Sequence, residues 1–123
     1  MTGGEAADGA NAAMVAINEI ENLAAQIARR FKPERIILFG SHAYGTSTPD
    51  SDVDILVVMP HNGDPLGKAV EIRCAIDRNF SLDVLVRSPD ELQWRLAEND
   101  WFTREIVEKG RVLHQTEHWQ ELR

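Results

Sequence analysis

The spacing of apolar residues predicts which parts of the chain form helices and which form strands. Apolar residues recur every three or four positions over residues 12–31, a pattern typical of one face of a helix. Residues 35–39 (RIILF) instead form a short continuous apolar run, which indicates a buried strand. Pro33 lies between the two segments and ends the helical pattern. The chain is therefore expected to begin with a helix that leads into a buried strand.

The same criteria divide the rest of the chain into alternating elements. Two further apolar runs, residues 52–59 and 81–87, predict strands, and Ser88-Pro89 followed by acidic residues is a helix-start pattern. The other expected segments are one helical turn at 42–45, a loop at 46–51, a turn at 60–65, helices at 66–79, at 88 to about 97 and at 99–109, and a short strand at 111–115. Strands alternating with helices predict an α/β (α+β) fold, with a small mixed β-sheet packed by helices.

Length, composition and charge narrow the class of protein. With 123 residues the chain fits one domain, expected at 12–123, after a flexible Gly- and Ala-rich tail at 1–11. The formal net charge of −7 makes nucleic acid an unfavoured partner, because backbone binding needs clustered Lys and Arg. A lone cysteine, Cys74, allows no intrachain disulfide and fits a reducing, cytoplasmic location. No apolar run is long enough to predict a membrane span.

Acidic residues interrupt two of the predicted strands. Asp52 and Asp54 lie two positions apart, so their side chains point to one face with Cα atoms ~6.6 Å apart. Asp83 is again a single acid in an apolar run, and it can join them if the two strands are neighbours. Carboxylate oxygens select Mg²⁺ or Mn²⁺ rather than zinc. Taken singly, Asp52 could instead close a turn and Asp83 could pair with an arginine at a sheet edge.

Gly40-Ser41 follows the first strand and supplies a complementary feature. A glycine lets the backbone approach a ligand closely, and a turn leading into a helix offers free N–H groups to phosphate oxygens. His42 comes next and could contact a phosphate or face solvent. Although a lone Gly-Ser is a common turn, its combination with three aspartates in this order favours metal-dependent phosphoryl or nucleotidyl transfer.

The stretch GSHAYGTSTPDSDVD carries a family resemblance. It has Gly-Ser, ten residues and Asp-x-Asp, and resembles the signature of the DNA polymerase β-like nucleotidyltransferase superfamily. The leading FKPERIILFGS and the later LDVLV fit the same pattern, and over residues 15 to 115 the chain looks like a minimal nucleotidyltransferase (MNT). The resemblance implies the polymerase β-like fold, with Gly40 and Ser41 binding the triphosphate of ATP. It also implies that Asp52 and Asp54 hold Mg²⁺, and that Asp83 helps to hold it and to activate the acceptor hydroxyl.

The resemblance also implies a partner. MNT proteins typically act as antitoxins beside an all-helical HEPN toxin, which here implies transfer of AMP from ATP to a toxin tyrosine. Two alternatives stay open: a nucleotidyltransferase for a small molecule of the aminoglycoside type, and a non-catalytic antitoxin that acts by direct binding. Tyr44 favours the last, because it stands where the family often has arginine and brings no cation to the phosphates. The aromatic residues after Asp83 fit either core packing or a docking face; they are Trp94, Trp101, Phe102 and Trp119.

Overall fold

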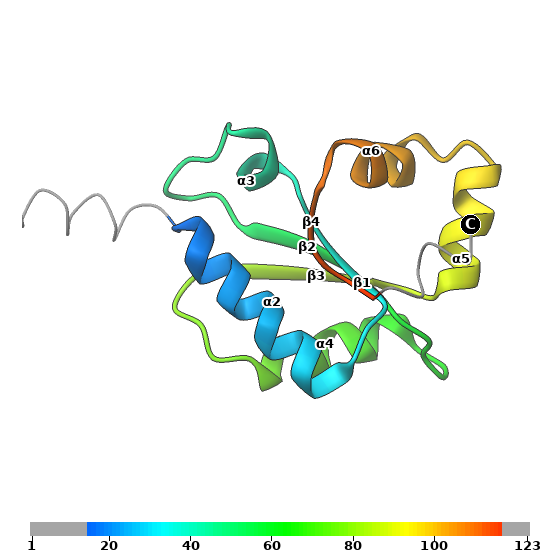
Figure 1. Ribbon diagram of the computed structural model, residues 1–123, viewed down its shortest axis with the longest axis horizontal. Helices are drawn as coiled ribbons and strands as arrows, with labels where there is room; N and C mark the ends of the chain where they lie inside the picture. Colours follow the sequence, from blue (N-terminus) through cyan, green and yellow to red (C-terminus); the bar gives the residue numbers. More distant parts are fainter. Residues whose placement is uncertain (1–14, 117–123) are drawn as a thin grey trace, which may run out of the picture.

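The computed structural model describes residues 15–116 (Figure 1). In chain order the elements are α2 (Ile17–Phe31), β1 (Arg35–Phe39), α3 (Ser41–Tyr44), β2 (Val53–Val58), α4 (Pro65–Ala75), β3 (Leu82–Arg87), α5 (Pro89–Ala97), α6 (Trp101–Lys109) and β4 (Arg111–Gln115). The expected tail at 1–11 and Trp119 lie outside the described residues, so the domain limits at 12 and 123 stay a prediction. No helix in the described part is long and apolar enough to cross a membrane.

The four strands form one mixed sheet in the order β3-β2-β1-β4. β1 pairs with β2 and with β4 in antiparallel fashion, whereas β2 and β3 are parallel. The parallel pair requires a crossover, and α4 provides it. The predicted fold class, a small mixed sheet packed by helices, is therefore confirmed.

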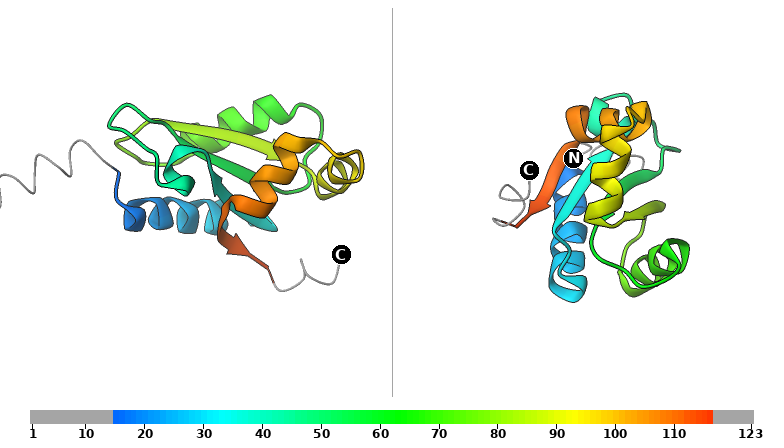
Figure 2. Two further views of the ribbon diagram at one scale, coloured as in Figure 1. Left: turned by 90° about the horizontal axis from the view of Figure 1, so that it is seen from above. Right: turned by 90° about the vertical axis from the view of Figure 1, so that its right-hand side faces the viewer.

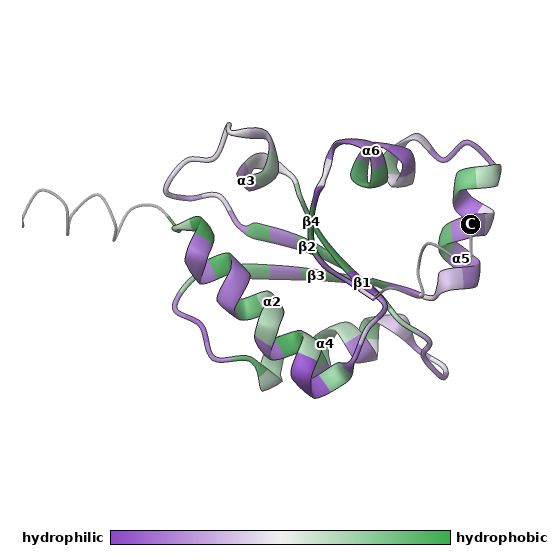
Figure 3. Cartoon of the chain, in the orientation of Figure 1, coloured by the Kyte–Doolittle hydropathy of each residue, from purple (hydrophilic) through white to green (hydrophobic). Residues whose placement is uncertain are grey.

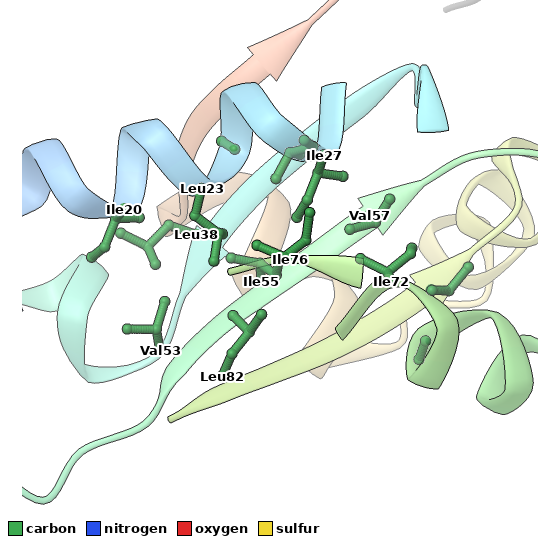
Figure 4. Packing of buried hydrophobic residues seen from close by; sticks show 14 of the residues in the cluster. Ile20, Leu23, Ile27, Leu38, Val53, Ile55, Val57, Ile72, Ile76 and Leu82 are labelled. Atoms are coloured by element: carbon green, nitrogen blue, oxygen red, sulfur yellow. The ribbon is translucent and has the colours of Figure 1, made fainter. Parts of the chain in front are cut away.

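Side chains that alternate along the strands build a core on each face of the sheet. On one face Val53, Ile55 and Val57 pack with apolar residues of α2 and α4 (Figure 4). On the other face Leu56 and Val58 pack with residues of α5 and α6. Figure 1 and the right-hand view of Figure 2 agree that α2 and α4 lie on one side of the sheet and α6 on the other.

The structure corrects several expected boundaries. The first helix was expected from residue 12, but Val15 is not helical and Ala16 has extended backbone angles, so α2 begins at Ile17. The helix expected at 66–79 instead spans Pro65–Ala75, because the Asp64 side chain accepts a hydrogen bond from the Leu66 N–H and caps it. It ends early because Ile76 is extended, with its side chain buried in the core.

The last helices show how local capping sets the ends. The predicted N-cap Ser88 is confirmed, since its Oγ accepts a hydrogen bond from the Glu91 N–H at 3.1 Å. The helix expected from residue 99 begins at Trp101 instead, because Asp100 caps it by accepting from the Phe102 N–H at 3.3 Å. This cap places an adjacent pair of aromatic residues, Trp101 and Phe102, at the start of α6.

Candidate active site

The three aspartates singled out in the sequence meet at one end of the parallel strand pair. Asp54 is the second residue of the central strand β2, and the register pairs it with Asp83 of β3. Asp52 lies just before β2, because the strand begins at Val53 rather than at 52 as expected. Figure 3 shows the hydrophilic bands on β2 and β3 side by side at this position. Asp54 is half-buried, whereas Asp52 and Asp83 are exposed.

These carboxylates repel one another, and the repulsion affects the pKa of Asp54. Burial raises the pKa of the Asp54 carboxyl, and the negative charges of Asp83 and then Asp52 raise it further. His42 has the opposite influence and lowers the pKa of Asp54. Three carboxylates thus share one electrostatic field, and a cation bound among them would relieve their repulsion.

The donor set fits a hard divalent cation, although the side chains do not form a closed cage. Within residues 15–116 no three carboxylate, imidazole or thiolate groups already surround one point as metal ligands do. Asp52 and Asp83 are exposed, so their side chains can change rotamer toward a bound ion without displacing core residues. All the available donors are carboxylate oxygens, which suit Mg²⁺ or Mn²⁺.

Gly40 brings the turn after β1 against the central carboxylate. Its φ of 77° and ψ of −160° belong to a region that is essentially restricted to glycine. A Cβ atom at this position would overlap Asp54 Oδ2. Among the described residues the N–H groups of Ser41 and His42 have no backbone acceptor, whereas those of the next two residues bond to the Gly40 carbonyl. Free N–H donors and a carboxylate cluster therefore face a common space.

His42 fastens the loop that leads to Asp52. Its Nε2 lies 3.3 Å from the Ser51 carbonyl oxygen, and Ser51 Oγ accepts a hydrogen bond from the Thr48 N–H at 2.8 Å. The sequence left the role of His42 open, and the structure gives it this contact in addition to its effect on Asp54. Its position one residue after Ser41 was the signal, but the contact depends on how the loop folds back.

Two hollows flank the cluster and meet at a pair of aromatic rings. One, of about 360 Å³, is lined by residues that include Asp54, Asp83 and Leu66. The other, of about 220 Å³, lies between α3 and α6; its lining is Phe39, Gly40, Tyr44, Trp101, Phe102, Glu105 and Ile106. Phe39 and Phe102 line both hollows and contact each other edge to face, with centroids 5.8 Å apart.

The aromatic residues of the last helices are mainly surface residues. Trp94 is 60% exposed and Trp101 72%, so neither belongs to the core, and Phe102 is 40% exposed. Sequence reasoning had left core packing and docking open for them and had not singled out Glu105. The helical pattern of α6 gave no indication of Glu105, because a charged residue in a surface helix is ordinary.

Comparison with known proteins gives consistent matches. The chain matches the family model described as a nucleotidyltransferase domain over residues 20–114. A relative from Methanocaldococcus jannaschii, named as a protein adenylyltransferase, is 34% identical over 103 residues, which cover 80% of this chain and 95% of the relative.

Solved structures extend these matches to the fold. A structure named as a nucleotidyltransferase from Sulfolobus solfataricus has a TM-score of 0.60 at 18% identity, covers 87% of this chain and 86% of its own, and shows likeness of fold alone. A toxin–antitoxin structure with AMP-PNP has a TM-score of 0.55 at 25% identity, covering 83% of this chain and 78% of its own. A mutant MntA–HpeT toxin–antitoxin structure has a TM-score of 0.54 at 21% identity, with the same coverage, and again shows fold alone.

Proposed function

Because the chain belongs to the nucleotidyltransferase domain family and is a nucleotidyltransferase, we propose that it transfers AMP from ATP to a tyrosine of a partner HEPN-type toxin. The observation that carries this proposal is the Gly40 turn, which is closed against Asp54 while Asp54 pairs with Asp83. The relative named as a protein adenylyltransferase supports a protein acceptor, and the toxin–antitoxin neighbour with AMP-PNP supports a toxin and an adenine nucleotide.

Each site residue has a task that follows from its position. The Ser41 and His42 N–H groups and the Ser41 hydroxyl donate hydrogen bonds to phosphate oxygens of ATP. Gly40 has no side chain, so the phosphates can approach the backbone closely at this turn. Asp52 and Asp54 would hold Mg²⁺, with Asp83 completing the set. The ion, when bound, neutralises phosphate charge and polarises the α-phosphate.

The reaction balances without any further reagent. The acceptor oxygen attacks the α-phosphorus of ATP, an O–P bond forms, and the bond to the bridging oxygen of pyrophosphate breaks. Asp83, exposed at the edge strand beside Asp54, accepts the proton of the acceptor hydroxyl.

The test is to incubate the protein with the product of the neighbouring gene, ATP and Mg²⁺, and to weigh the product by intact mass spectrometry. We expect the partner to gain the mass of one or more AMP groups and Asp54→Asn to abolish the gain. Asp50→Asn, an exposed acid of the preceding loop, is the matched control and should transfer normally. A complex that forms without any mass gain would exclude the transferase proposal for this partner.

Neutralisation by binding alone is the second candidate, and Tyr44 is the observation that favours it. Burial and then the negative charge of nearby Glu105 raise the pKa of the Tyr44 hydroxyl. A tyrosine side chain is neutral or negatively charged, so Tyr44 offers no cation to a phosphate. Asp52→Ala and Asp54→Ala variants that still neutralise the toxin fully would establish this second function. Loss of neutralisation with retained complex formation would instead support the transferase.

A further inference from the structure

The hollow between α3 and α6 combines aromatic walls with a single carboxylate. Phe39, Tyr44, Trp101 and Phe102 supply the rings, and Glu105 supplies the charge. Trp101 is 72% exposed and Tyr44 39%, so Trp101 is largely open to solvent and Tyr44 partly so. Exposed tryptophan and tyrosine around a hollow of about 220 Å³ are typical of a recognition surface.

Glu105 is the polar feature of this hollow that lacks a compensating charge. Its neighbour one turn along α6, Glu108, pairs with Arg104 at 3.1 Å. No residue in the described part of the chain forms a hydrogen bond or ion pair with the half-buried Glu105 carboxylate. Its negative charge reaches across the hollow to Tyr44, whose pKa it raises. The hollow therefore presents electron-rich ring faces and one unpaired negative charge.

The chemistry that complements such a hollow is a cation with flat or aliphatic sides. A guanidinium stacks on aromatic faces and bonds a carboxylate through two parallel N–H groups. The phosphates of a nucleotide are unsuited to it, because they would face Glu105 at short range. A net charge of −7 adds long-range attraction for a basic partner surface.

We propose that this hollow docks an arginine side chain of the acceptor protein. Phe39 and Phe102 line both hollows, so a polypeptide anchored by arginine between α3 and α6 can present its hydroxyl in the adjoining hollow at Asp54 and Asp83. The identification of the arginine's carrier as the acceptor rests on the proposed function, whereas the preference of the hollow for a guanidinium does not.

The first experiment needs neither ATP nor a partner. N-acetyl-arginine amide is titrated into the full chain while the indole N–H resonance of Trp101, assigned through its loss in Trp101→Phe, is followed by NMR. We expect saturable binding in the millimolar range, and no saturable shift with N-acetyl-citrulline amide, which has a similar shape without the charge. Glu105→Gln should weaken binding about fivefold, the size of a partly exposed ion pair. Glu108→Gln on the same helix should not change it.

The second experiment uses the acceptor identified by the mass assay. Trp101→Ala should raise the KM for the acceptor protein several-fold and leave nucleotide affinity unchanged, whereas Trp94→Ala, also exposed but outside the hollow, should change neither. Three results would overturn the inference: equal binding of citrulline and arginine probes, displacement of the arginine probe by adenosine, or a concentration-dependent dimer that Trp101→Ala abolishes. Failure of AMP transfer with intact arginine binding would refute the proposed function alone.

Discussion

Replacing Gly40 by alanine should damage both the stability of the fold and the candidate site. Gly40 has φ 77° and ψ −160°, where an L-residue costs ~1–3 kcal/mol of strain. The new Cβ would also overlap Asp54 Oδ2, so the carboxylate has to move before the turn can close. We therefore expect the free energy of unfolding to fall by at least ~2 kcal/mol, or roughly 6–12 °C in Tm for a domain of this size.

Gly63→Ala is the control that separates backbone strain from the steric clash with Asp54. Gly63 also has a positive φ, of 80°, but nothing lies within 4 Å of a Cβ built there, so only about 1 kcal/mol should be lost. Urea unfolding followed by circular dichroism gives both losses, and the mass assay gives AMP transfer. Gly40→Ala should lose transfer even at temperatures where it is fully folded, whereas Gly63→Ala should keep it. Equal stability losses together with full transfer by Gly40→Ala would refute the argument that this turn must lie against Asp54.

Three further predictions concern charge, capping and packing. The pKa of Asp54 is raised above its ordinary value of 3.8, so the stability that Asp54 contributes is fully present below that pH and is lost as pH rises through the raised pKa. In urea titrations across pH, Asp54→Asn should remove this loss of stability, whereas Asp50→Asn should not. Ser88→Ala should cost ~1 kcal/mol of unfolding free energy, since it leaves the Glu91 N–H without its cap, and an unchanged urea midpoint would contradict this. Leu92→Ala, at a fully buried position of α5, should cost ~2–5 kcal/mol by the same assay, whereas Leu66→Ala at 74% exposure should stay within ~0.5 kcal/mol.

The elements and chemistry of this protein follow closely from local sequence. The continuous apolar run at 35–39 indicated a buried strand, and β1 is fully flanked by β2 and β4. Ser88-Pro89 located a helix start to the residue, because an N-cap is decided by a side chain and an N–H three positions away. The ends of α2 and α4 differ from the expected ones because Ala16 and Ile76 have extended backbone angles, and the Ile76 side chain is buried in the core.

The candidate site likewise combines features that are local in the sequence with features that depend on the tertiary structure. Sequence spacing alone predicted that Asp52 and Asp54 share a face and indicated their ligand chemistry, because alternation along a strand is a local property. Only the tertiary structure could pair Asp83 with Asp54, since the parallel register of β2 and β3 depends on the crossover through α4. Only it could bring Glu105 and Trp101 beside Gly40, more than 60 positions away in the chain. Local pattern determined which groups are present, and long-range packing decided which of them meet.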